Sequence, residues 1–295
     1  MVTFCFIERL PAHHHFRRYL YIWKLNNACM RPSVCLSFDV EEWDSPSVFH
    51  VESPHAMSCE FSAQGLASII ELFDRHGIRT SFYVTGVFAR QHPGIVGKLG
   101  AAGHEVGVHG DAHRDLSGLP FDELKAEIRR GKESVEKAVG GKVRGFRSPR
   151  NMVNPNLYKA LKGLAFTYDS SVHPAVLPGR YLDFLQSGSI RSVEGITEVP
   201  MSTFLGLPIS WWWMRNVGVE YTRLGCQASM RMHGYALLYF HPWEFAKLPK
   251  VEGLPGHMTK GTGKKALEDL ERLIRGLSER GCMFQTVEEI AASRR

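Results

Sequence analysis

Two histidines stand four residues apart in the segment 104–113, which reads HEVGVHGDAH. Neutral imidazole is the commonest protein ligand for a catalytic divalent metal, and His109 and His113 can approach one ion from a tight loop. His109 ends a short apolar run with Val106 and Val108, which predicts a buried strand. Because the chain holds 14 histidines, the pair needs support from other residues before it predicts a metal site.

Further polar residues follow apolar runs in the same way. Each of them comes at or just after the carboxyl end of a predicted strand: Asp39 and Glu41, His109, Arg147, Asp169 and His241. In barrels of parallel strands these ends gather on one face, where the chemistry takes place. The same placement at five strands predicts one converging site.

The elements that must position these residues alternate between strand and helix patterns. Predicted strands cover 33–40, 80–85, 104–109, 143–146, 165–168, 196–201 and 235–240. Predicted helices cover the stretch between a Ser62 cap and Gly77, then 93–102, 124–139, 156–164, 219–233, 264–280 and 288–292, the last capped by Thr286. Residues 173–195 are weakly periodic and predict a long loop. Such alternation without an internal repeat favours an α/β fold, a distorted parallel (β/α) barrel with seven or eight strands.

Length and charge limit the organisation and the partners. A chain of 295 residues with 44% hydrophobic residues can bury the core of one large domain. Most of the formal net charge of +6 falls in residues 1–32, which hold five basic residues and one acidic residue. We therefore predict that residues 1–32 form an extension outside the core, that 33–295 form the domain, and that nucleic acid is not a partner.

The cysteines and the N-terminus suggest a compartment. The six cysteines are scattered without a CxxC spacing, which favours reduced thiols in a cytoplasmic protein. Charged residues and the tract His13–His15 interrupt the apolar patches before a signal peptide can form, and no run reaches transmembrane length. We expect a cytoplasmic location without stable membrane insertion, and the oligomeric state stays open.

Five segments together resemble a known family. SFDVEEW (37–43), HGDAH (109–113), FRSPR (146–150), YDSS (168–171) and LYFH (238–241) match, in order and spacing, the motifs of polysaccharide deacetylases with a NodB-homology domain. FDVEEW with YFHPWE resembles the branch found in bacterial exopolysaccharide gene clusters. The resemblance implies a NodB-type barrel that removes acetyl groups from an N-acetylated glycan by metal-activated water, with zinc as the usual ion.

The resemblance also assigns acid and base roles. Asp39 matches the family's general base, and Arg147 matches the arginine that orients it. His241 matches the general acid, and Asp169 matches the carboxylate that holds this histidine. An acetamide is a poor electrophile, so its hydrolysis needs both a base for the attacking water and an acid for the departing amine.

His109 and His113 match the family's metal ligands, but the third ligand departs from the common pattern. The usual second aspartate is Val40 in this chain. Side chains alternate along a strand, so Glu41 is the next carboxylate on the Asp39 side, and we predict that it completes the metal site. Glu42 or water is the alternative.

Four further residues are candidates for substrate binding. Arg150 stands where an aromatic residue is more usual in the family, which changes the inherited substrate contacts. Trp212, within the triplet Trp211–Trp213, is typical of a platform for sugar rings, although a buried structural role is an equal alternative. Trp243 and Glu244 follow the predicted acid, and they line the pocket or pack the loop beside it.

Two other functions remain open from the sequence. A metal-dependent amidohydrolase acting on a non-glycan bond, such as that of a cyclic ureide, would use the same fold and ligands. A catalytically weak glycan-binding protein is suggested by Val40 at a ligand position. The retained acid and base residues argue against the second alternative, because a binder does not need them.

Overall fold

The computed structural model describes residues 32–177, 181–182 and 186–293. Its main feature is a curled sheet of nine strands in the order β12, β1, β2, β3, β4, β5, β9 and β8, with β13 beside β1. The predicted extension, residues 1–32, lies outside the described residues except for Pro32. All pairings in this sheet are parallel except the one between β8 and β9. The prediction of a distorted parallel barrel is confirmed.

The strands are short, and among the described strands the sheet curls without β-ladder pairing between β8 or β9 and β12. Their bounds are β1 (Ser33–Val40), β2 (Ser81–Val84), β3 (Glu105–Val108), β4 (Gly145–Phe146), β5 (Tyr168–Asp169), β8 (Arg191–Val193), β9 (Ile196–Glu198), β12 (Tyr235–Phe240) and β13 (Met283–Phe284). On the open side, Ser202 beyond β9 donates its backbone N–H to Leu237 in β12 at 3.0 Å. The Leu237 N–H in turn donates to the Ser202 hydroxyl at 2.9 Å.

The predicted loop 173–195 is more structured than expected. It contains β6 (Val176–Leu177), β7 (Tyr181–Leu182) and β8, and a further hairpin follows at β10 (Thr203–Phe204) and β11 (Leu207–Pro208). These strands are two or three residues long, too short for a periodic sequence pattern to reveal them.

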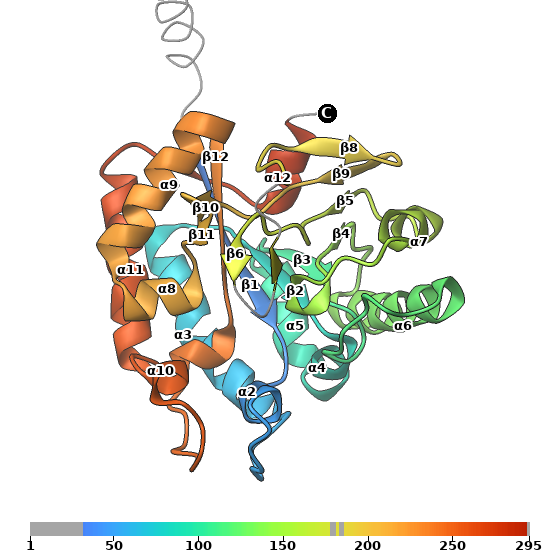
Figure 1. Cartoon of the computed structure of the whole chain (residues 1–295), viewed down its shortest axis with the longest axis horizontal. Coiled ribbons are helices and arrows are strands. Elements are labelled where there is room, and N and C mark those ends of the chain that lie inside the picture. Colours follow the sequence, from blue (N-terminus) through green and yellow to red (C-terminus); the bar gives the residue numbers. More distant parts are fainter. Residues whose placement is uncertain (1–31, 178–180, 183–185, 294–295) are drawn as a thin grey trace, which may run out of the picture.

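The helices lie around the curled sheet, with α9 and α11 along one side and α6 and α7 along the other (Figure 1). Their bounds are α2 (Ser45–Val48), α3 (Glu60–His76), α4 (Gly86–Gln91), α5 (Pro93–Ala101), α6 (Phe121–Val139), α7 (Leu157–Gly163), α8 (Trp211–Asn216), α9 (Val219–His233), α10 (Gly256–Thr259), α11 (Lys264–Ser278) and α12 (Val287–Ala292), with 3₁₀ helices η1 (Pro149–Asn151) and η2 (Pro242–Phe245). Among the helices of the described residues, none is long and apolar enough to span a membrane.

The helix ends follow the sequence signals with one exception. Gly77 ends α3 in the left-handed conformation at φ 62°, and the Thr286 side chain caps α12. Ser62, which we predicted as a cap, lies inside α3, and its hydroxyl donates to the Glu41 carbonyl oxygen at 2.6 Å. Helix α3 therefore starts earlier, at Glu60, and Ser62 fixes the end of β1 instead.

Burial on both faces of the strands sets which side chains reach the interior. In β1, Val34, Leu36, Phe38 and Val40 belong to the apolar layer packed against the helices, whereas Cys35 belongs to a separate interior cluster. Side chains alternate along a strand, so Asp39 shares the interior side with Cys35. Val40 points into the helical layer, away from the interior side on which Asp39 lies.

Candidate metal centre and catalytic site

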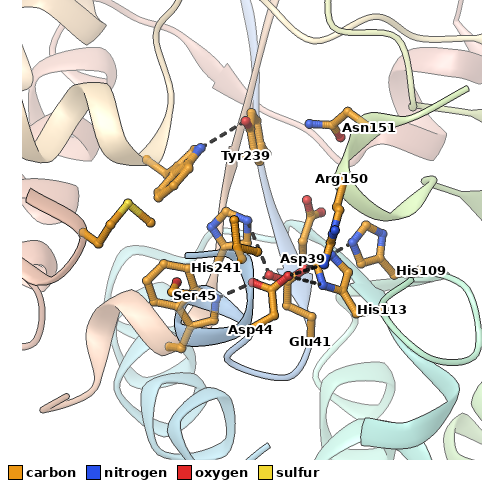
Figure 2. A pocket seen from close by; sticks show the side chains of 14 residues that line it. Asp39, Glu41, Asp44, Ser45, His109, His113, Arg150, Asn151, Tyr239 and His241 are labelled. Atoms are coloured by element: carbon orange, nitrogen blue, oxygen red, sulfur yellow. Dashed lines mark hydrogen bonds and ion pairs between the residues drawn. The ribbon is translucent and has the colours of Figure 1, made fainter. Parts of the chain in front are cut away.

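A pocket at the carboxyl ends of the strands gathers most of the predicted site residues (Figure 2). Strand register explains why they meet. Phe38 pairs with Phe240, so Asp39 and His241 follow adjacent positions of neighbouring parallel strands. The side chains that line the pocket are Asp39, Glu41, Asp44, Ser45, Val48, His109, His113, Arg150, Asn151, Trp211, Tyr239, His241, Trp243 and Met258. Of the predicted site residues, Arg147, Asp169, Trp212 and Glu244 lie outside this lining.

Glu41, His109 and His113 form a group whose ligand atoms all lie within 4.8 Å of one another. Glu41 Oε2 is 3.3 Å from His109 Nε2 and 2.9 Å from His113 Nε2. All three residues are buried. Two imidazoles and one carboxylate form a ligand set typical of a catalytic zinc, which keeps a fourth position for water or substrate.

The hydrogen bond of His109 to Arg147 leaves its other ring nitrogen as an acceptor that faces Glu41. His109 Nδ1 lies 2.9 Å from the Arg147 carbonyl oxygen, an acceptor only, so the ring proton belongs on Nδ1. His109 Nε2 then presents a lone pair to Glu41 Oε2, and neither atom has a hydrogen-bond partner among the described residues. Two buried acceptors that face each other are costly unless a cation lies between them.

Asp44 supports the second imidazole. His113 Nδ1 lies 3.1 Å from Asp44 Oδ2, and the same oxygen lies 3.1 Å from Arg150 Nη2. Metal-binding histidines commonly give their other ring N–H to a carboxylate, which fixes the ring and leaves the opposite nitrogen free to bind. The sequence analysis did not identify Asp44, although it follows directly after the SFDVEEW segment.

The electrostatics of this group favour positive charge at its centre. Burial alone would raise the pKa of Glu41, but the neighbouring His113 and His241 outweigh it and hold the pKa well below its usual 4.5. Burial alone would lower the pKa of His113, but Glu41 and Asp44 raise it well above its usual 6.5. The Glu41 carboxylate therefore favours its ionised form, which attracts a proton or a metal ion.

The alternation of β1 continues one residue beyond the strand. Asp39 and Glu41 both line the pocket, and Val40 between them does not. The Glu42 carboxylate, our alternative ligand, instead accepts a hydrogen bond from the Thr85 hydroxyl at 2.9 Å. The geometry thus brings Glu41, rather than Glu42, to the two histidines.

Arg147 is enclosed beneath Asp39 and holds it from one side. Arg147 Nη1 donates to Asp39 Oδ1 at 2.7 Å and to the Ser37 hydroxyl at 2.8 Å. Its Nε and Nη2 donate to the carbonyl and hydroxyl oxygens of Ser170, both at 3.0 Å, and the guanidinium lies 4.2 Å from the Tyr83 ring centre. These contacts fix the guanidinium, so Asp39 has one defined orientation at the pocket.

His241 stands opposite His109 and His113, between two indole rings. Its ring stacks on Trp243 at 5.0 Å and meets Trp211 edge-on at 4.9 Å. Its Nδ1 lies 3.2 Å from Glu244 Oε1, and its Nε2 lies 3.7 Å from Glu41 Oε1. Burial alone would lower the pKa of His241, but Glu41 and Glu244 outweigh it and raise the pKa. A raised pKa suits a residue that must carry a proton.

The prediction that Asp169 holds His241 is wrong. Asp169 accepts hydrogen bonds from the Ser171 hydroxyl at 2.7 Å and the Ser171 backbone N–H at 3.2 Å. Burial and the adjacent Asp169 carboxylate raise the pKa of Glu198. The described contacts give the His241 Nδ1 position to Glu244 instead, because residue i+3 of the 3₁₀ helix η2 is closer than a strand across the barrel.

Two of the substrate-binding predictions also need correction. Trp212 packs against Trp213 and His257, and it is Trp211 that lines the pocket. Successive residues of a helix such as α8 point about 100° apart, so only one residue of the triplet faces the pocket. Glu244 is buried behind His241, whereas Arg150 and Trp243 reach the pocket as expected.

Two family models match consecutive parts of the chain. Residues 31–168 match the polysaccharide deacetylase family, and residues 170–292 match a domain of unknown function, DUF3473. Peptidoglycan-N-acetylmuramic acid deacetylase PdaA of Bacillus subtilis (strain 168) is 26% identical over 99 residues, which cover 33% of this chain and 38% of that protein. The chain spans less than half the length of the first curated relatives that it matches.

Solved structures share the fold. A Mycobacterium smegmatis protein assigned to the polysaccharide deacetylases superposes with a TM-score of 0.65 at 21% identity, covering 89% of this chain and 90% of that chain. The Puue allantoinase superposes with a TM-score of 0.60 at 15% identity, covering 88% and 89%. At such identities the likeness establishes the fold and leaves the substrate open.

Proposed function

We propose that this chain is a metal-dependent hydrolase that removes N-acetyl groups from an N-acetylated polysaccharide or oligosaccharide, because residues 31–168 match the polysaccharide deacetylase family. The observation that carries the proposal is the paired acceptors at the centre of the pocket. His109 Nε2 and Glu41 Oε2 face each other in a buried site, with Asp39 and His241 at its two sides. This arrangement has a place for a cation between a base and an acid.

Glu41, His109 and His113 would hold the divalent ion, and zinc suits this ligand set. When bound, such an ion lowers the pKa of water and polarises the acetamide carbonyl. The chain's own residues supply the proton transfers. Asp39, fixed by Arg147, accepts the proton of the attacking water. His241 then donates a proton to the sugar nitrogen, so that the departing amine leaves as a neutral group.

The walls of the pocket suit a sugar ring. Trp211 and Trp243 meet at a ring separation of 6.0 Å and both line the pocket, so aromatic faces are available beside His241. Arg150 stands at the pocket with its side chain about one-third exposed and available to a polar substituent. Within the glycans, we propose a bacterial exopolysaccharide on the strength of the paired segments FDVEEW and YFHPWE.

The test is acetate release by the purified full chain from a panel of N-acetylated glycans, with elemental analysis of the same sample. We expect about one zinc per chain, acetate release from at least one glycan, loss of activity with a chelator, and recovery with added zinc. Hydrolysis of a cyclic ureide without acetate release would replace the proposal with the amidohydrolase alternative. Glycan binding without turnover by the metal-loaded protein would replace it with the binding alternative.

A further inference from the structure

We infer that Glu244 and Arg215 are the positioning residues of His241, and that they hold its imidazole with Nε2 turned to the substrate nitrogen. The inference rests on the proposed function, in which His241 is the acid. It assigns to a buried ion pair on η2 and α8 the role that the family resemblance gives to Asp169.

Glu244 holds both the backbone and the ring of His241. Its Oε1 accepts the His241 backbone N–H at 2.8 Å and lies 3.2 Å from His241 Nδ1. Since Glu244 Oε1 already accepts the His241 backbone N–H, it acts as an acceptor for the ring as well, which keeps a proton on Nδ1. The proton that His241 can transfer is then the one on Nε2, the nitrogen that faces Glu41 across the pocket.

Arg215 fixes Glu244 in turn. Its Nε donates to Glu244 Oε2 at 2.7 Å, and the two side chains are 0% and 1% exposed. The other guanidinium nitrogens donate to the carbonyl oxygens of Lys260 and, at 3.2 Å, of Met258. Every nitrogen of Arg215 is thus used, and the planar fork joins α8, η2 and the end of α10 in one arrangement. Met258 also lines the pocket, so the same clamp sets part of the pocket wall.

Burying the ion pair of Glu244 and Arg215 costs desolvation free energy, so stability alone does not explain it. Replacing a buried ion pair with apolar residues is often neutral or stabilising, so burial of Glu244 and Arg215 is poor support for a purely structural role. A fixed tautomer and ring orientation is what an acid needs, because proton transfer depends on geometry at the reacting atom.

The variant Glu244→Gln tests the inference, since it keeps the size of the side chain and removes its charge. Two substrates separate the roles: an N-acetylated oligosaccharide, whose amine must be protonated to leave, and p-nitrophenyl acetate, whose phenolate leaves without a proton. We expect kcat on the oligosaccharide to fall about 10²-fold with KM little changed, and hydrolysis of the ester to fall less than about 3-fold. His241→Ala should show the same selectivity.

Arg215→Lys and the double variant Glu244→Gln/Arg215→Lys complete the test. If Arg215 acts through Glu244, the double variant loses no more activity than Glu244→Gln alone. Glu42→Gln is the matched control, because Glu42 also carries a buried carboxylate, which bonds to Thr85. This variant should keep both activities. Arg215→Lys retains a cation beside Glu244, so it is expected to fold, and the zinc content checks each variant.

The outcomes distinguish this inference from the proposed function. A wild-type chain that releases no acetate overturns the proposed function. A wild-type chain that is active while Glu244→Gln keeps full activity on the oligosaccharide overturns the inference alone. Equal losses on both substrates in Glu244→Gln, with zinc retained, also overturn it, because they show general damage rather than a misplaced acid.

Discussion

Residues 31–168 and residues 170–292 each supply one side of the pocket, by different structural means. The first part supplies Asp39 and Glu41 at the end of β1, and His109 and His113 after the end of β3, and both strands pair in parallel with β2. The second part supplies His241 at the end of β12, and it supports this residue from a 3₁₀ helix and the short helix α8. On the first, strand-end side, strand register places the site residues, whereas on the second side register places His241 and short segments place the residues that support it.

This difference decides how well sequence motifs carry over. On the strand-end side, pairing of Val108 with Phe146 brings His109 beside Arg147 whatever the loops do. On the other side, the partner of His241 is Glu244 and not Asp169, because a local helical turn supplies a closer carboxylate. In this chain strand pairing fixes the position of Arg147, whereas the partner of His241 depends on a local turn.

The largest expected effect falls on the strand-end side, at Glu41. Glu41→Ala should lose bound zinc and lower activity by about 10²-fold or more, because even supporting residues of a metal site cost 10–100-fold in affinity. Excess zinc should restore part of the activity. Elemental analysis after dialysis, with acetate release on the same samples, measures both.

Glu42→Ala is the control for Glu41→Ala, since the Glu42 carboxylate bonds to Thr85 and not to the two histidines. It should retain zinc and activity. If Glu42→Ala lost zinc and Glu41→Ala kept it, the alternation of β1 would end at residue 40 and the metal site described above would be wrong.

The next largest effects are expected at Asp39 and His241, one residue from each side of the pocket. Asp39→Asn and His241→Ala should each lower kcat by about 10² to 10⁴-fold while zinc stays bound, since neither belongs to the ligand group. Steady-state kinetics with zinc analysis checks this. A metal-free form of either variant would contradict the division between ligands and proton-transfer residues.

A smaller effect is expected at Asp169, and it should be on stability. Asp169→Ala leaves the Ser171 hydroxyl and backbone N–H without their acceptor, which costs about 1–3 kcal/mol of unfolding free energy. Urea unfolding followed by tryptophan fluorescence measures it. A selective loss of kcat on the glycan, with unchanged stability and unchanged ester hydrolysis, would return Asp169 to the role of holding His241.

The smallest effect is a pH dependence at Glu198. Burial and Asp169 raise the pKa of Glu198 well above its usual 4.5, so the folded state binds a proton that the unfolded state releases. The stability from this group is fully present below pH 4.5 and is lost as the pH rises through the folded pKa. Glu198→Gln cannot ionise, so the variant should gain on the wild type by at most about 1.4 kcal/mol per pH unit in this window.

Unfolding curves of Glu198→Gln and the wild type between pH 4 and pH 8 check this prediction, in roughly the range where carboxyl groups with raised pKa values titrate. A constant difference between the two proteins across the range would show that folding does not raise the pKa of Glu198.

The sequence by itself determined the architecture and the chemical types of the site. Apolar runs such as YALLYF gave β12 at residues 235–240, and the helix pattern gave α9 at residues 219–233, both with the bounds observed. It also placed Asp39, Glu41, His109 and His241 at strand ends, since alternation and parallel pairing are local rules that a sequence displays.

Only the tertiary structure decided which side chains meet beyond the strand ends. Trp211 rather than Trp212 faces the pocket because the rotation of α8 depends on what it packs against. Arg215 and Asp44 carry no motif, and their roles follow from contacts across 29 and 69 residues of sequence, to Glu244 and His113. A contact between distant segments is set by packing of the whole domain, so no local pattern contains it.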